Sequence, residues 1–177
     1  MRSTIRATAA TRSGELSRTG DDATAWTVRY ASQEDVEPVA TAVRDLLIEL
    51  GGQPPPTASM RATVRTLVED QQAGALLVAR SDEGGLVGLL AASWPTAIHA
   101  GGSYGLIQDL WVDPMWRGRT VGESLLEALR GIAKAAQVTR VEVGLPRVDF
   151  AGIQATTAFY GRNGFEQLGT RMRLVIS

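Results

Sequence analysis

The chain has 177 residues, no cysteine, and 18 basic against 19 acidic side chains, for a formal net charge of −1. This size fits one domain that buries roughly 70% of the surface its unfolded chain exposes, so stability requires neither a disulfide nor a metal. The composition excludes a thiol nucleophile and cysteine zinc sites, gives no support for a nucleic-acid or membrane partner, and suits a soluble protein of the reducing cytoplasm.

The N-terminal residues are rich in Ser, Thr, Ala and Arg, with little apolar periodicity. We therefore expect a flexible extension over residues 1–24 and a folded domain over residues 25–177. The alternating segment Ala25–Tyr30 predicts a strand, and Ser32–Asp35 is typical of a capping box that opens a helix. The apolar stripe of that helix ends before the sequence Gly-Gly-Gln-Pro-Pro-Pro, which terminates it.

The same periodicity rules predict the remaining elements. They are a helix capped by Thr57 or Ser59, a hairpin of Ala75–Ala79 and Leu86–Ser93, a strand over Tyr104–Val112, a helix with the stripe Val121 to Ile132, a strand over Val141–Leu145, a helix over Gln154–Arg162, and terminal strands over Gly164–Leu168 and Arg171–Ile176. Periodicity by itself supports only an α/β or α+β domain with a strand-loop-helix-strand crossover.

The segment Val112-Asp-Pro-Met-Trp-Arg-Gly-Arg-Thr-Val-Gly122 is a glycine-bearing turn between a strand and a helix. Backbone amides of such a turn and the positive end of the helix dipole favour an anion such as a pyrophosphate. The sequence is neither a P-loop nor a dinucleotide-binding fingerprint. From Arg117 to Gly122 it resembles the Arg/Gln-x-x-Gly-x-Gly/Ala acyl-CoA loop of the GNAT superfamily of N-acetyltransferases.

Thr120 departs from this pattern because it occupies the position of the family's first spaced glycine. A left-handed conformation there would cost a β-branched residue about 1 to 2 kcal/mol. In the helical region threonine is a suitable N-cap whose hydroxyl can donate to a phosphate oxygen. Of these two alternatives we favour the helical conformation.

A second match follows about forty residues downstream, where Phe159–Phe165 resembles the family's Leu/Phe-Tyr-x-x-x-Gly-Phe segment. The resemblance implies that Tyr160 lies beside the acyl thioester. Tyr160 can alternatively be a packing residue of an amphipathic helix. The family's frequent asparagine seven residues earlier is Ile153 here, so this chain lacks the amide side chain that usually contacts the cofactor arm in the family.

The resemblance implies the GNAT fold, a mixed, mostly antiparallel sheet flanked by helices in the order β-α-α-β-β-β-α-β-α-β-β. It also implies a transferase that moves an acetyl group from the cosubstrate acetyl-CoA, without a metal, to a primary amine of a small molecule by direct attack. Whether such a chain forms a homodimer is left open. The residues implied to bind acetyl-CoA are Leu110, Trp111, Val112, Arg117, Gly118, Arg119, Thr120, Val121, Gly122 and Ser124.

The chemistry of that transfer adds two candidate catalytic residues. Deprotonating an amine of pKa ~10.4 at pH 7 costs about 4.6 kcal/mol, so a base is useful. Some family members carry Glu-Asp where this chain has Gln108 and Asp109. Asp109 is therefore the candidate base, with a structural carboxylate that caps a loop or pairs with an arginine as the equal alternative. Tyr160 is the candidate general acid for the leaving thiolate.

Besides a structural interaction domain that binds no CoA, two other functions are alternatives to this enzyme. The first is acetylation of a protein N-terminus or lysine, which needs an open groove rather than an enclosed pocket. The second is a non-catalytic acyl-CoA-binding module, suggested by the departures at Gln108, Thr120 and Ile153.

Overall fold

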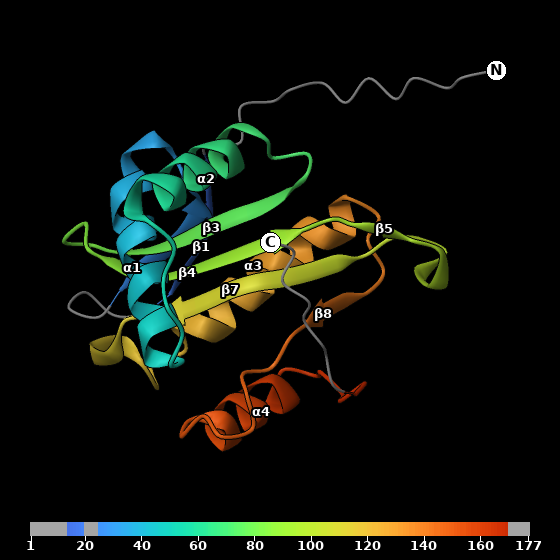
Figure 1. The fold of residues 1–177 in the computed structure, drawn as a ribbon. Helices are drawn as coiled ribbons and strands as arrows, with labels where there is room; N and C mark the ends of the chain where they lie inside the picture. The colour runs from blue at the N-terminus through green and yellow to red at the C-terminus, as the bar shows by residue number, and fades with distance from the viewer. Residues whose placement is uncertain (1–13, 20–24, 170–177) are drawn as a thin grey trace.

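The structure, a computed structural model, describes residues 14–19 and 25–169. Its centre is a six-stranded sheet in the order β1-β2-β3-β4-β7-β8 (Figure 1). The strands are β1 (Glu15–Thr19), β2 (Trp26–Tyr30), β3 (Gly74–Ser81), β4 (Leu86–Ser93), β7 (Gly105–Val112) and β8 (Val141–Val143). Neighbouring strands are antiparallel except β7 and β8, which run parallel. The predicted mixed, mostly antiparallel sheet is confirmed.

Helices cover both faces of this sheet (Figure 1). Helices α1 (Val36–Glu49) and α2 (Thr57–Glu69) cover one face, and α3 (Val121–Ala135) covers the other. Helix α4 (Ile153–Arg162) follows β8. The short elements are η1 (Gln33–Asp35), β5 (Thr96–Ala97), η2 (Ile98–Ala100), β6 (Gly102–Ser103) and η3 (Pro114–Trp116).

Strand β3 explains why the sequence has an uninterrupted apolar run at its centre. Leu77 belongs to the cluster on the α3 side, whereas Leu76 and Val78 belong to the cluster under α1 and α2. A strand buried on both faces has no solvent side, so it does not alternate between apolar and polar residues. The predicted hairpin of β3 and β4 is confirmed by their antiparallel pairing.

A buried aspartate anchors the start of α1. Asp35 is fully buried and accepts hydrogen bonds from Arg29 of β2 and Arg80 of β3. It also accepts one from the Ser32 amide at 2.7 Å, the reciprocal contact of a capping box. The capping box that the sequence predicts therefore ties the helix to two strands.

The chain ends differ from the prediction where the structure describes them. Residues 15–19 lie within the predicted flexible extension, yet they pair with β2 as strand β1. The segment 164–168, predicted as a strand, is not a strand. A strand needs a ladder partner, and its predicted partner, residues 171–176, lies outside the described residues.

Candidate active site

The loop between β7 and α3 turns the chain out of the sheet and into a helix. β7 ends at Val112, and the Asp113 amide donates to the Val87 carbonyl of β4 at 3.0 Å. The Asp113 carboxylate accepts a hydrogen bond from the Met115 amide at 2.8 Å, which fixes the 3-10 turn. Helix α3 then begins at Val121. The predicted order of strand, loop and helix is confirmed.

Two residues of this loop have left-handed backbone conformations. Gly118 has φ +76°, and an added Cβ there would meet nothing within 4 Å. Glycine is therefore favoured here by the left-handed backbone conformation and not by close packing. Thr120 has φ 63° and ψ 11°, so the expected helical conformation is wrong. Its hydroxyl donates to the Arg119 carbonyl at 2.7 Å and does not cap the helix.

The physical reason lies in the path of the loop. Arg117 is still extended, with φ −64° and ψ 145°, and the helix starts four residues later. The chain must reverse direction within that span, and the tertiary path overrides the local preference of threonine. The left-handed conformation costs Thr120 about 1 to 2 kcal/mol.

The first turn of α3 offers backbone amides that no side chain of its N-cap satisfies. The Ser124 amide donates to the Thr120 carbonyl at 3.0 Å, and the Ser124 hydroxyl donates to the same oxygen at 3.1 Å. The amides of residues 121–123 come before this first intrahelical bond and have no acceptor within the helix. These donors and the helix dipole favour an anion.

The two arginines of the loop are held by side chains beside it. The Arg117 guanidinium makes a bidentate ion pair with Glu49 at the end of α1, at 2.8 and 2.6 Å, and its Nε donates to the Val112 carbonyl. The hydrogen bond to Glu49 raises the pKa of Arg117. The Arg119 guanidinium lies 5.4 Å from the centre of the Trp116 ring. The loop therefore presents amides, with Arg119 nearby and the charge of Arg117 balanced by Glu49.

A β-bulge divides strand β7 into two halves. Ala92 of β4 pairs with Ile107, whereas the preceding Ala91 pairs with Asp109, so Gln108 is an extra residue. A bulge re-aims the side chains that follow it. Ile107 packs on the α3 side of the sheet, and Asp109, two residues later, lines a cavity on the α1 and α2 side. The bulge is the reason for this change of face.

Strand β8 accompanies only the first half of β7. The parallel pairing joins residues 105–107 to residues 141–143 and stops there. Beyond Ile107, this edge of β7 has no strand partner among the residues that the structure describes. An unpaired edge presents amide and carbonyl groups for pairing. Leu110, Trp111 and Val112, which the resemblance assigns to the cofactor arm, lie on this stretch.

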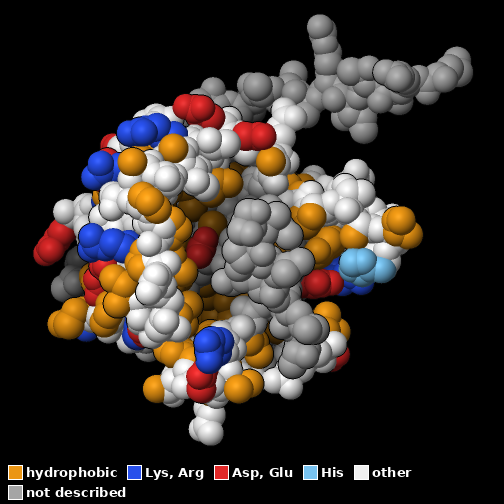
Figure 2. Space-filling model, in the orientation of Figure 1, with side chains coloured by type: hydrophobic (Ala, Val, Ile, Leu, Met, Phe, Trp, Pro, Cys, Tyr) orange, Lys and Arg blue, Asp and Glu red, His pale blue; other side chains and the backbone are white. Residues whose placement is uncertain are grey.

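Asp109 is a half-buried carboxylate in a mostly apolar cavity of about 260 Å³ between α1, α2 and the sheet. Burial raises the pKa of Asp109 above its ordinary value. Within residues 14–19 and 25–169 it makes no hydrogen bond or ion pair. The alternative of a carboxylate that caps a loop or pairs with an arginine therefore finds no support there. Figure 2 shows hydrophobic side chains around a hollow on this face.

Tyr160 lies on α4 with its ring between two other aromatic rings. The ring centres of Phe159 and Phe165 are each 5.2 Å away, in edge-to-face arrangements. Burial raises the pKa of Tyr160 to about 12. Its hydroxyl has no hydrogen-bond partner in the described part of the chain. The packing role is therefore real, and the phenol stays protonated with its donor unused.

Helices α3 and α4 meet at Gly122. A Cβ at this position would lie 3.0 Å from two ring carbons of Phe159, closer than most real contacts. Gly122 of the loop motif thus allows α3 and α4 to pack closely. Its contact with Phe159 positions the residue next to Tyr160. The sequence placed Gly122 in the loop without predicting this contact.

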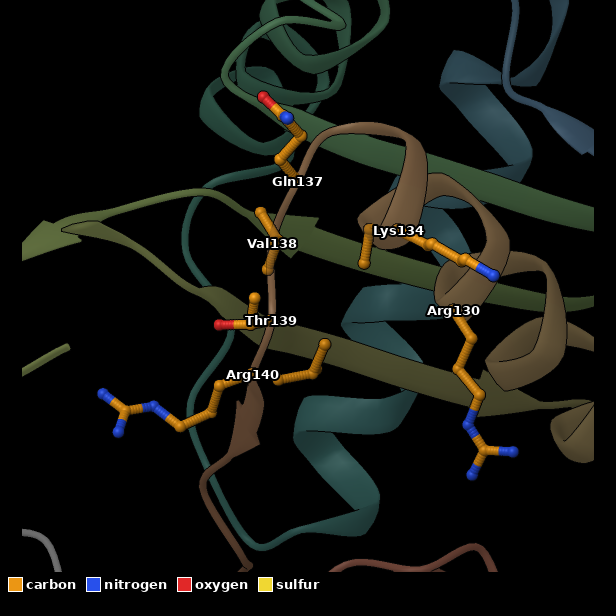
Figure 3. Close-up of a pocket in the computed structure, with 8 residues that line it drawn as sticks. Arg130, Lys134, Gln137, Val138, Thr139 and Arg140 are labelled. Carbon is orange, nitrogen blue, oxygen red and sulfur yellow. The ribbon is translucent and has the colours of Figure 1, made fainter. Parts of the chain in front are cut away.

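A second, larger cavity of about 410 Å³ lies at the other end of α3, and Figure 3 shows its lining. Arg130, Lys134 and Arg140 surround it. Arg140 pairs with Glu142, and Arg130 donates to the Asn163 carbonyl, so two of the three cations already have partners. It lies away from the loop before α3, and no sequence motif points to it.

Two further findings concern other kinds of site. Among the described residues there is no group of three or more His, Cys, Asp or Glu side chains that could hold a metal ion. No helix in the same part of the chain has the length and apolar character to cross a membrane.

Comparison with known proteins identifies the family. The model of the acetyltransferase (GNAT) domain matches residues 72–167, which is more than half of the chain. The chain therefore belongs to the GNAT family of acetyltransferases, as the loop before α3 and the Tyr160 segment predicted. No curated protein matches it.

Solved structures share the fold at low sequence identity. One is a predicted acetyltransferase from Clostridium acetobutylicum with acetyl-CoA (TM-score 0.68, 16% identity, covering 85% of this chain and 96% of that one). Another is the ribosomal-protein-alanine N-acetyltransferase of Brucella melitensis (TM-score 0.66, 18%, 86% and 99%). A third is an aminoglycoside acetyltransferase from an uncultured soil sample (TM-score 0.68, 22%, 86% and 99%). These likenesses confirm the fold.

Two features of the site were not predicted from the sequence. Glu49 pairs with Arg117 from 68 positions away, and no local signal announces such a contact. The apolar stripes of α1 and α2 predicted the two helices, but not that part of each stripe lines the cavity at Asp109. Hydrophobic periodicity predicts which face of a helix is turned toward the interior. It does not predict whether the space next to that face is completely packed.

Proposed function

We propose that this GNAT protein is an acetyl-CoA-dependent N-acetyltransferase whose acceptor is the primary amine of a small molecule. The observation that carries the proposal is the placement of Asp109. Its carboxylate has no partner among the described residues, lines a small cavity, and lies on the part of β7 whose edge is free of β8. A cavity of this small volume suits a small amine better than a peptide, which needs an extended groove.

The residues present fit acetyl-CoA. The amides of residues 121–123 would hold its diphosphate, with Arg117 and Arg119 beside them. The free edge of β7 at Leu110–Val112 would hold the pantetheine arm and polarise the thioester carbonyl through its amides. Acetyl-CoA supplies the acetyl group as a thioester and departs as the free thiol.

Asp109 and Tyr160 divide the proton transfers of the reaction. Asp109 accepts a proton from the acceptor's ammonium group, which frees the nitrogen lone pair. The nitrogen then forms a bond to the acetyl carbon while the bond from that carbon to sulfur breaks. Tyr160 donates its proton to the leaving sulfur, and the second nitrogen proton restores the phenol through solvent. One proton is released overall.

The raised pKa of each group suits its role in a different way. A carboxylate of raised pKa is a stronger base than an exposed aspartate. A phenol whose pKa is raised to about 12 stays protonated at neutral pH and is always available as a donor.

The test is release of free CoA from acetyl-CoA across a panel of small amines, amino sugars and peptides, with mass spectrometry of the products. We expect acetylated small amines. A product made only from peptides would favour the protein acetyltransferase alternative. Tight acetyl-CoA binding in calorimetry without turnover of any acceptor would favour a non-catalytic binding module.

A further inference from the structure

The cavity at Asp109 has a lining that restricts which amines it can accept. Four apolar side chains come from α1 and three from α2: Val39, Ala40, Val43, Leu47, Met60, Val64 and Leu67. These residues are buried or half-buried and form the walls, whereas Pro55, Ser59 and Thr63 of the same lining are exposed and form its rim. The floor is the sheet, and Asp109 is the one charged group among the lining residues that the structure describes.

The polar groups of the lining are few. Besides Asp109 they are the hydroxyls of Ser59 and Thr63 on α2. The Thr63 hydroxyl already donates to the Ser59 carbonyl at 3.0 Å. The cavity thus offers one negative charge and little capacity for further hydrogen bonds. A second ammonium group or a ring of hydroxyls placed inside would lose water without gaining partners, which is unfavourable.

The size of the cavity sets a second limit. Its volume of about 260 Å³ is roughly nine times the ~30 Å³ that a water molecule occupies in the liquid. A ligand of roughly eight to ten non-hydrogen atoms would fill it, which is below the usual range of drug-sized sites.

From these observations we propose that the acceptor is a monoamine: one primary amine on a small apolar body, aliphatic or aryl-alkyl. The ammonium group lies on the Asp109 carboxylate and the hydrocarbon lies between the walls of α1 and α2. This inference rests on the proposed function and adds the class of substrate. It separates this chain from enzymes whose acceptors carry several amino or hydroxyl groups.

The first test is a chain-length series of n-alkylamines with steady-state kinetics and acetyl-CoA at saturation. Each added methylene should raise kcat/KM about fourfold until the cavity is filled, because it buries one more apolar group. The rise should stop near the length given by the volume. A flat series would overturn the proposal.

The second test compares matched pairs, n-butylamine with 1,4-diaminobutane and n-hexylamine with 1,6-diaminohexane. Each diamine has a second charge at the end that enters the cavity. Its kcat/KM should therefore be lower than that of the monoamine by a factor of about ten or more. Diamines or amino sugars that equal the monoamines would overturn the inference while leaving the acetyltransferase function intact. If no amine of any class is acetylated, the proposed function falls, and the inference falls with it.

A variant pair tests whether this cavity causes the preference. Thr63 and Thr66 are both exposed on α2, and each donates its hydroxyl to the carbonyl four residues earlier, but only Thr63 lines the cavity. Thr63→Asp adds a second carboxylate at the cavity and should shift the ratio of diamine to monoamine kcat/KM upward. Thr66→Asp should leave the ratio unchanged. Equal shifts in both variants would contradict the assignment.

Discussion

Asp35 and Asp109 are two aspartates that the fold withdraws from water with opposite results. Burial would raise the pKa of Asp35, but the hydrogen bonds from Arg29, Ser32 and Arg80 outweigh it, and the pKa is lowered. Asp109 has burial alone, so its pKa is raised. The first carboxylate is satisfied within the chain, and the second has no partner within the described residues.

The difference separates a carboxylate that stabilises the fold from one that is available to a ligand. A buried charge with several hydrogen bonds ties elements together and has no capacity left for a ligand. A desolvated carboxylate without partners costs free energy in the folded state, and such groups are typical of functional sites. Tyr160 belongs with Asp109, because its side chain is largely buried and its hydroxyl also has no partner in the described part of the chain.

The largest expected effect comes from Asp109→Asn. Loss of the base should lower kcat/KM by about 10²- to 10⁴-fold. In the wild type, kcat/KM should fall as the pH is lowered through the raised pKa of Asp109, and the variant should lack this acid limb. Steady-state kinetics as a function of pH measure both effects.

The same variant has a clear expectation for stability. A carboxyl whose pKa is raised on folding stabilises the folded state below its unfolded pKa, and this contribution is lost as the pH rises through the folded pKa. At neutral pH the charged carboxylate of Asp109 therefore destabilises the folded state. Asp109→Asn should unfold at an equal or higher temperature. A variant that lost activity and stability together would mean that Asp109 is structural.

Tyr160→Phe comes next and tests the other unpaired group. We expect kcat to fall about 100-fold, with little change in acetyl-CoA affinity, because the ring packing between Phe159 and Phe165 is kept. Since the pKa of Tyr160 is about 12, a loss of activity near pH 9 must come from another group. Tyr104→Phe, outside the site, is the matched control and should retain full turnover.

Asp35→Asn should have the opposite profile, with a loss of stability as its primary effect. Removing one partner of a buried charge network costs about 3 kcal/mol, measured by denaturant unfolding at pH 7. Because the folded pKa of Asp35 is lowered, its contribution is present above the unfolded pKa and is lost as the pH falls through the folded pKa. Wild type and variant should therefore converge in acid. Asp149→Asn breaks an exposed pair with Arg147 and should change stability little.

The smallest expected effect concerns Gly122, which positions the helix that carries Tyr160. Gly122→Ala would push a methyl group against the Phe159 ring, and overpacking of this kind costs about 1 kcal/mol or more. Gly131→Ala, in the same helix with open space around it, should instead stabilise by about 0.5 to 1 kcal/mol. Thermal unfolding compares the two, and equal shifts would contradict the role given to Gly122.

Local signals predicted most of the fold. The stripes of α1, α2 and α3 and the β3-β4 hairpin follow from periodicity, because helices and hairpins are built from contacts between near neighbours in sequence. Strand β1 escaped prediction because a short polar segment becomes a strand only when another strand is present to pair with it. Thr120 was placed in the wrong region because the path of its loop is set by the elements at both ends.

The sequence by itself determined the family, through two short motifs that can be recognised from neighbouring residues alone. It also named Asp109 and Tyr160 as candidates. Only the tertiary structure decided what surrounds them: the bulge that turns Asp109 toward α1 and α2, the apolar walls, and the contact of Gly122 with Phe159. These depend on strand register and on side chains far apart in sequence, and burial and pKa follow from such neighbours rather than from the residue itself.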